Sequence, residues 1–527
     1  MSASSALARF SLHALLALTL AGQASAASFT VNVSTDDADA NIDGTCETIA
    51  TNGQCSLRAA LMEANAVAPP MGETHHIVFD IPPGDACFSG HPDHCGIMFT
   101  AELPDIVRPV SIDGSTQTGG SGICSSAIPD RPPYPIVLDG SSAYGAKLRL
   151  EQGSDGSSIR GLNLQQMTDA IAIVRSNGNT IACNFIGTDN SGSNSGATGS
   201  NFNGVILGCS STGNIIGGPA VGDGNLIAGS EFDGIQINGA IPCVPDNGTP
   251  DGNFILGNYI GVQKDGATPF PVGYSGISMY DGSGPDNNRV GVMPDGGSGV
   301  LRAPNVIGGS TYDGIYIADG VSGAVISGNF IGTGLSGAEQ IGNGSGGVYV
   351  DNSQSILIGG PDPADANTFA FNAYNGVAVD SGATGIRIQR NIMYGNHDIG
   401  IDLGLDGKTL NDADDSDSGA NTLLNFPEIH GVQQGGGMVT IDYSVPVDTL
   451  SPNLPLEIEF YIADGGTTQG AILIGTDTYA APGIKQASFA EGSYSNGDQI
   501  TATATDSSGN TSEFSVSPML FRDGFED

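Results

Sequence analysis

Short runs of alternating apolar and polar residues, each bounded by Gly or Asn, recur along most of the chain. In one form of the repeated phrase, an aromatic residue and a turn residue precede Gly and an alternating run, as in residues 232–237 (FDGIQI) and 312–317 (YDGIYI). A second form begins with Asn and continues through apolar residues to Gly, as in residues 305–308 (NVIG). Period-two alternation between turn residues predicts short β-strands with a turn at each end.

Strands this short cannot bury their apolar faces alone, but stacked copies of one unit can bury them against each other. Gly376 and Gly400 occupy the same place in consecutive phrases and lie 24 residues apart, about one coil of a β-helix. Asn tolerates the turn backbone and can stack its amides from coil to coil. The sequence therefore predicts an all-β fold, a right-handed parallel β-helix solenoid over residues 101–407. A β-sandwich of many short strands is the alternative, although sandwiches do not repeat a phrase in register.

Residues 55–65 (CSLRAALMEAN) have the pattern of an amphipathic helix. Leu57, Leu61 and Ala64 share one helical face, and Ser56 is a favourable N-cap. A solenoid needs its open end covered, and a helix just before the first strands can cover it. We predict an N-terminal capping region over residues 27–100 that contains this helix, although an ordinary surface helix would have a similar sequence.

The same segment resembles a known family, the secreted bacterial β-helix proteins that carry an N-terminal Cys-Ser-Leu-Arg-Glu-Ala sequence (CSLREA-domain proteins, of pectin-lyase-like fold). Residues 55–60 read CSLRAA, so that Ala59 stands where the family has Glu. Further similarities lie at residues 109–114, 136–142, 258–261, 329–333, 400–404 and 425–427. The resemblance covers most of the chain after residue 26. It implies a secreted β-helix protein and no settled reaction.

The N-terminal residues 1–26 have the features of a signal peptide. Arg9 is followed by an apolar stretch over residues 12–20 and by small residues at 24–26. No later segment is apolar over the length that a transmembrane helix needs. We therefore expect a secreted, extracellular or cell-surface protein whose eight cysteines form disulfides. Spacing favours the pairs Cys46 with Cys55, Cys87 with Cys95 and Cys183 with Cys209, which leaves Cys124 and Cys243, although other pairings stay open.

The pattern changes in the C-terminal part of the chain. Longer alternating runs, such as residues 456–462 and 500–505, predict a small antiparallel β-sandwich of immunoglobulin or fibronectin type over residues 426–518. An acidic linker is expected between the two domains, at residues 408–425. The last residues, 519–527, resemble a short terminal tag of some secreted bacterial proteins, and a frayed end is equally compatible with them.

The charge balance excludes several partners. The formal net charge is −40, with 16 Lys and Arg against 56 Asp and Glu. A nucleic-acid-binding protein needs a basic stripe, which this sequence does not show. An acidic polysaccharide would also be repelled by this field. A neutral polysaccharide, a surface protein or a cation remains as a partner.

Aromatic residues supply the candidate binding site. In the phrase Gly-Ile-x-Ile the position x points outward, so Tyr316 and Tyr349 should be exposed at matching places of the repeat. Exposed tyrosines on a flat sheet can stack on sugar rings, although two tyrosines that only cover the sheet would look the same. The aromatic residues that precede the repeat Gly are expected to form a packed ladder: Phe202, Phe232, Tyr274, Tyr312 and Tyr374.

An acidic stretch supplies the candidate metal site. Asp412, Asp414 and Asp417 lie close together in a loop that ends in Gly, and carboxylates in a flexible loop suit Ca²⁺. The spacing does not match an EF-hand. A solvated acidic linker is the alternative interpretation.

No catalytic residue can be assigned from the sequence. Uronate lyases need Lys or Arg beside the reacting carbon, and the repeats contain few of either. The best local group, His397 and Asp398 with Asp402, would place its carboxylates about 13 Å apart on a strand. A hydrolase needs them at about 5 to 9.5 Å. We therefore predict a non-catalytic protein for adhesion or neutral-glycan binding. The alternative is a polysaccharide-active lyase, hydrolase or epimerase of the pectin-lyase-like fold.

Overall fold

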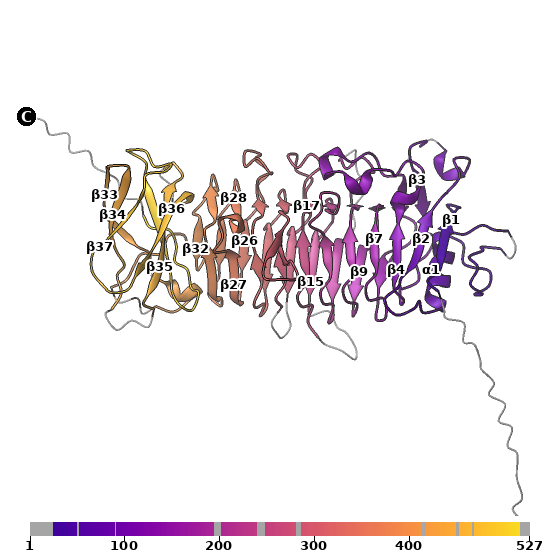
Figure 1. The fold of residues 1–527 in the computed structure, drawn as a ribbon, viewed down its shortest axis with the longest axis horizontal. Coiled ribbons are helices and arrows are strands. Elements are labelled where there is room, and N and C mark those ends of the chain that lie inside the picture. Colours follow the sequence, from indigo (N-terminus) through magenta and orange to yellow (C-terminus); the bar gives the residue numbers. More distant parts are fainter. Residues whose placement is uncertain are drawn as a thin grey trace, which may run out of the picture.

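The computed structural model describes residues 25–49, 52–89, 91–193, 202–239, 248–280, 286–413, 415, 417–448, 453–465 and 468–516. Most of the predicted signal peptide, the predicted tail 519–527, Asp414 and Cys243 lie outside the described residues. The described chain is an elongated rod in which strands are stacked along the long axis (Figure 1). Helix α1 (Leu57–Ala66) lies at one end of this rod, and antiparallel strands close the other end.

Three parallel sheets form the body of the rod, and the chain visits them in turn. The first sheet contains, in spatial order, β1 Ser28–Val31, β2 His75–Phe79, β4 Val110–Asp113, β7 Ser158–Arg160, β10 Thr180–Ala182, β13 Ile215–Gly217, β16 Phe254–Leu256, β19 Arg289–Val290, β24 Val325–Ile326, β27 Gln354–Gly359 and β30 Thr384–Gln389.

The second sheet contains β3 Cys95–Met98, β5 Ile136–Asp139, β8 Asn163–Gln165, β11 Phe185–Ile186, β14 Leu226–Ile227, β17 Tyr259–Ile260, β22 Val306–Ile307, β25 Phe330–Ile331, β28 Thr368–Ala370 and β31 Ile392–Tyr394. The third contains β6 Leu148–Leu150, β9 Asp169–Val174, β12 Asn203–Gly208, β15 Ile235–Asn238, β18 Ile277–Tyr280, β23 Ile315–Ala318, β26 Val348–Val350, β29 Val377–Val379 and β32 Ile401–Leu403. The predicted right-handed parallel β-helix is confirmed.

Parallel pairing begins earlier than residue 101. Strand β1 pairs with β2, and β2 pairs with β4, within and next to the predicted capping region 27–100. The reason is the inward-facing pair Phe29 and Ile77, which lie in register and are buried in the solenoid core. Helix α1 packs on this first coil with Leu57 and Leu61 buried. As predicted, Ser56 is the N-cap: its side chain accepts a hydrogen bond of 3.0 Å from the Ala59 amide.

The interior is held by stacked apolar residues and by ladders of buried asparagines at the turns. Each ladder amide donates to the side-chain oxygen of the next coil, for example Asn258 to Asn305 at 3.0 Å and Asn305 to Asn329 at 2.9 Å. The longest ladder runs through Asn184, Asn225, Asn258, Asn305, Asn329, Asn367 and Asn391. These amides satisfy turn backbone groups that no strand can pair.

Two of the three predicted disulfides are present and the third is wrong. Cys46 pairs with Cys55, and Cys87 pairs with Cys95. Cys183 pairs with Cys124 instead of Cys209, because the short helix η3 (Ile123–Ser125) in a long loop packs over the coil that carries Cys183. Cys209 is also disulfide-bonded. Disulfides persist in oxidising compartments, which fits an extracellular protein. Within the described chain, no helix is long and apolar enough to cross a membrane.

Two three-stranded antiparallel sheets follow the solenoid and share one core. They contain β33 Glu428–Gly435, β34 Met438–Ser444 and β37 Lys485–Ala490, and β35 Leu456–Ala463, β36 Gly470–Tyr479 and β38 Ile500–Thr505. Smaller elements are the hairpin β20 Val292–Pro294 with β21 Val300–Arg302, and the short helices η1 Ala86–Phe88, η2 Gly114–Thr116, η4 Ile128–Asp130, η5 Pro363–Asp365 and η6 Ala420–Leu423.

The antiparallel domain covers the last coil directly. Gln469 accepts a hydrogen bond of 2.8 Å from the side chain of Asn396, and so continues an asparagine ladder of the solenoid. Glu513 accepts a hydrogen bond of 3.0 Å from the Leu403 amide. Tyr461 and Phe514 join the solenoid core. The domain therefore closes the C-terminal end of the β-helix.

Candidate functional site

Two rows of residues run along the outward side of the third sheet, across its strands. The edge row precedes the strands, and consecutive members are joined by backbone hydrogen bonds: Phe202, Phe232, Tyr274, Tyr312, Ser345, Tyr374 and Asp398. The face row lies within the strands, with members opposite one another in register: Ser278, Tyr316, Tyr349, Ala378 and Asp402.

The first four aromatic members of the edge row contact one another, and all five face solvent. Ring centroids are 5.7 Å apart for Phe202 and Phe232, 5.2 Å for Phe232 and Tyr274, and 5.5 Å for Tyr274 and Tyr312. Their exposed fractions lie between 37% for Phe202 and 52% for Tyr312, and Tyr374 reaches 54%. The predicted ladder is thus present from Phe202 to Tyr312, but it does not reach Tyr374, because Ser345 stands between Tyr312 and Tyr374.

The face row brings together the two tyrosines that the sequence singled out. Tyr316 and Tyr349 lie opposite each other on β23 and β26, with ring centroids 5.4 Å apart and planes 4° apart. Both side chains are half-buried. The Tyr349 hydroxyl donates a hydrogen bond of 2.8 Å to Asp380. Burial raises the pKa of Tyr316 to about 12, so its hydroxyl stays protonated.

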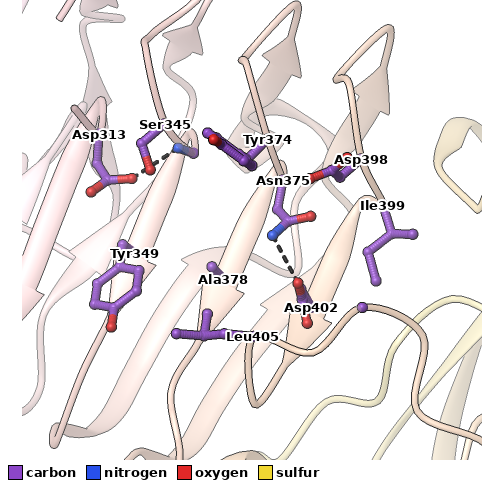
Figure 2. Close-up of a pocket in the computed structure, with 12 residues that line it drawn as sticks. Asp313, Ser345, Tyr349, Tyr374, Asn375, Ala378, Asp398, Ile399, Asp402 and Leu405 are labelled. Atoms are coloured by element: carbon purple, nitrogen blue, oxygen red, sulfur yellow. Dashed lines mark hydrogen bonds between the residues drawn. The ribbon is translucent and has the colours of Figure 1, made fainter. Parts of the chain in front are cut away.

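A cleft of about 590 Å³ opens where both rows lose a ring (Figure 2). In the edge row Ser345 stands between Tyr312 and Tyr374, and in the face row Ala378 follows Tyr349. These small residues leave a hollow between the rings of Tyr349 and Tyr374 (Figure 2). The loop after β32 adds Leu405 and Gly407 to its wall.

The bottom of the cleft is polar and acidic. The Asn375 side-chain amide donates a hydrogen bond of 2.9 Å to Oδ2 of Asp402. Asn375 and Asp402 are only 7% and 5% exposed, yet the Oδ1 atom of each has no hydrogen-bond partner. Asp313 and Asp398 also line the cleft. No Lys, Arg or His is among the described residues that line it.

Burial raises the pKa of two of these carboxyl groups above the ordinary range. For Asp402 the neighbouring Asp406 and Asp398 add to the effect of burial, while the Asn375 amide and the Gly407 backbone oppose it. For Asp313 burial also dominates, against hydrogen bonds from Ser345 and the Gly346 backbone, the latter at 2.8 Å. The cleft therefore holds groups that can bind or release a proton closer to neutral pH than a free carboxylate.

Asp313 and Asp402 lie too far apart to form a hydrolase pair. Asp313 precedes β23 and Asp402 lies on β32, three strand spacings away, which corresponds to roughly 14 Å. Glycoside hydrolases place the two groups at about 5 to 9.5 Å. His397, considered from the sequence, bonds to Asp398 at 2.9 Å, but its side chain is 79% exposed and does not line the cleft.

The predicted calcium ligands lie elsewhere, in the segment that leads to the antiparallel domain. Asp412 accepts hydrogen bonds from the Asp415 amide at 2.7 Å and the Asn425 side chain at 3.1 Å, and Asp417 is exposed. Asp414 is not described. Among the residues whose placement is described, no group of three or more His, Cys, Asp or Glu could hold a metal ion. Calcium binding at Asp412, Asp414 and Asp417 stays a prediction.

Comparisons with known proteins support only the fold of the chain. No protein-family model matches the chain, and no curated protein matches it in sequence. Similar solved structures include the A-module of a mannuronan C-5 epimerase from Azotobacter vinelandii, at 14% identity over 68% of this chain and 88% of that one, with a TM-score of 0.34.

A periplasmic alginate epimerase is 14% identical over 65% of this chain and 79% of its own, with a TM-score of 0.30. The catalytic domain of a GH87 α-1,3-glucanase is 13% identical over 71% of this chain and 63% of its own, with a TM-score of 0.28. Those three proteins are polysaccharide-active enzymes. At these values the likeness carries no argument about the activity of this chain.

Proposed function

We propose that this chain is a secreted protein that binds a polysaccharide in the cleft between Tyr349 and Tyr374. Its predicted signal peptide and its disulfides support secretion. Support for binding comes from the two aromatic rows, which run across consecutive coils on one side of the rod. A polymer laid along the rod axis would meet the same type of side chain once per coil.

One observation carries the proposal: the ring of Tyr349 lines the cleft and stacks on another ring on one side only. Tyr316 stacks against Tyr349, and the next residue in register is Ala378, whose side chain is too small to cover the ring. An aromatic ring in a polar surrounding suits a sugar, which has apolar faces and polar edges. Asp402 and Asn375 supply acceptors for donors of the same sugar.

Asp402 favours a second candidate function, an enzyme that acts on the bound polysaccharide. Its pKa is raised, mainly by burial, and one of its oxygens points to no protein donor. A carboxyl group in such a place can remain protonated and act as a general acid. Binding without catalysis comes first because the aromatic rows support it in several coils, whereas the enzymatic alternative rests on Asp402.

A polysaccharide screen tests the two candidates together. The purified chain is offered neutral and acidic polysaccharides, and binding, reducing ends and unsaturated products are all measured. We expect binding of a polysaccharide without acidic groups, at least tenfold weaker in Tyr349→Ala and nearly unchanged in Tyr349→Phe, because Phe keeps the ring. If the wild type released reducing ends or unsaturated products and the Asp402→Asn variant did not, the chain would be an enzyme instead. If the Tyr349→Ala variant bound the polysaccharide as tightly as the wild type, the cleft would not be the binding site.

A further inference from the structure

Two unpaired oxygens at the bottom of the cleft require a hydrogen-bond donor. Asp402 Oδ1 and Asn375 Oδ1 are buried and have no partner, and buried acceptors in that state are unfavourable. Asn375 cannot turn its amide toward the cleft without losing the 2.9 Å bond that it donates to Asp402. Both acceptors are therefore left without a hydrogen-bond donor from the described protein.

The charges around these acceptors favour a cationic donor over a neutral hydroxyl. Asp313 and Asp398 line the same cleft, and Asp406 lies close enough to affect the pKa of Asp402. No basic residue lines the described cleft to compensate them. A protonated amine brings three donors, no acceptor and a positive charge, and the nearby tyrosine rings can attract it further.

We infer that the cleft recognises a protonated primary amine carried by a sugar, so that the ligand is a polysaccharide containing amino sugars. This inference rests on the proposed function and names its substrate class. A volume of about 590 Å³ is far more than an ammonium group needs and lies within the range of about 300–1,000 Å³ for small-molecule sites. The ring of Tyr349 suits the body of a pyranose, while Asp402 and Asn375 take its amine.

Calorimetry with three matched probes tests this inference. The probes are a tetramer of β-1,4-linked glucosamine, the tetramer of N-acetylglucosamine with the same linkage, and trilysine. We expect the glucosamine tetramer to bind the wild type at least tenfold more tightly than the other two. The advantage should shrink as salt rises, because ions screen the attraction. The wild-type comparison needs no variant, so it does not depend on the folding of a mutant.

Asp402→Asn keeps the shape of the side chain and removes its charge, so it should abolish the preference for the free amine. Asp80→Asn removes the same charge from an exposed position in the first coils and should keep the preference. Equal binding of the two tetramers, with both weakened by Tyr349→Ala, would overturn this inference and leave polysaccharide binding intact. Trilysine binding as tightly as the glucosamine tetramer would overturn the assignment to a sugar. A preference that survives in Asp402→Asn would also contradict the inference.

Discussion

The ring of Tyr349 stacks on that of Tyr316 at 5.4 Å, and the next residue in register after Tyr349 is Ala378. The step from a tyrosine to an alanine ends the run of rings in the face row, just as Ser345 interrupts the rings of the edge row one coil earlier. The cleft exists because two rows of rings each lose a member in neighbouring coils. Its shape thus depends on two small residues as much as on the tyrosines.

Restoring a ring in the edge row should close the cleft. We predict that Ser345→Tyr weakens polysaccharide binding at least tenfold, because the new ring would fill the gap between Tyr312 and Tyr374. The variant should melt only slightly below the wild type, because aromatic residues occupy the equivalent place in other coils with 37% to 54% exposure, while the Ser345 hydrogen bond to Asp313 is lost. Calorimetry and thermal melts check both parts.

Phe232→Ser is the matched control, because it removes a ring from the same row several coils away from the cleft. Unchanged binding in Phe232→Ser, together with loss in Ser345→Tyr, locates the ligand in the cleft. If Phe232→Ser weakened binding as much as Ser345→Tyr, the whole edge row and not the cleft would be the binding surface.

Glu513 should make stability depend on pH. Burial raises its pKa from 4.5 to about 7, against the opposing effect of Lys408. Between these values the folded chain holds a proton that the unfolded chain has released. The contribution of Glu513 to stability is therefore complete below pH 4.5 and is lost as pH rises to about 7, with a slope of up to about 1.4 kcal/mol per pH unit.

Urea unfolding of the wild type and Glu513→Gln at pH 5, 6 and 7 measures this slope. The free energy of unfolding should fall less steeply with pH in the variant, and Glu428→Gln, an exposed control, should follow the wild type. Parallel curves for all three proteins would show that Glu513 does not titrate in this interval.

The longest asparagine ladder should be sensitive to the loss of a single amide. Asn305→Ala would leave the Asn258 backbone amide and side-chain amide without their shared acceptor, at 2.9 and 3.0 Å in the wild type. Each buried unpaired donor costs about 1–3 kcal/mol, so we expect a loss of at least about 2 kcal/mol in chemical denaturation. Asn41→Ala, at an exposed position, should change stability by less than about 0.5 kcal/mol. Equal effects of the two would contradict the role of the ladder.

Calcium should stabilise the segment that joins the two domains. Several carboxylates in this short stretch repel one another, and a divalent ion at Asp412, Asp414 and Asp417 would relieve the repulsion. Extracellular sites often bind at about 10⁻⁴ to 10⁻³ M, so thermal melts need millimolar calcium against chelator. We expect a higher melting temperature with calcium in the wild type, and little difference in Asp412→Ala with Asp414→Ala. Superimposable wild-type melts would leave an acidic segment without a metal.

Most of the fold could be predicted because the repeat fixes it locally. The alternation in runs such as 312–317 and the Asn of each turn determine strand, turn and stacking together. The cleft could not be predicted, because it depends on Ser345, Ala378 and Asp402 coming together from three coils. Aligning the phrases by their Gly residues would have revealed the missing rings. The Cys124–Cys183 bond was missed for a related reason, since a loop and not a coil brings Cys124 into place.

A crystal structure of the chain with the oligosaccharide that binds best in the screen tests the central claim most directly. We predict a sugar ring between Tyr349 and Tyr374, with one face against the Tyr349 ring and a donor within hydrogen-bond distance of Asp402 Oδ1. A sugar bound elsewhere, for example along Phe202, Phe232 and Tyr274 with the cleft left empty, would contradict the account.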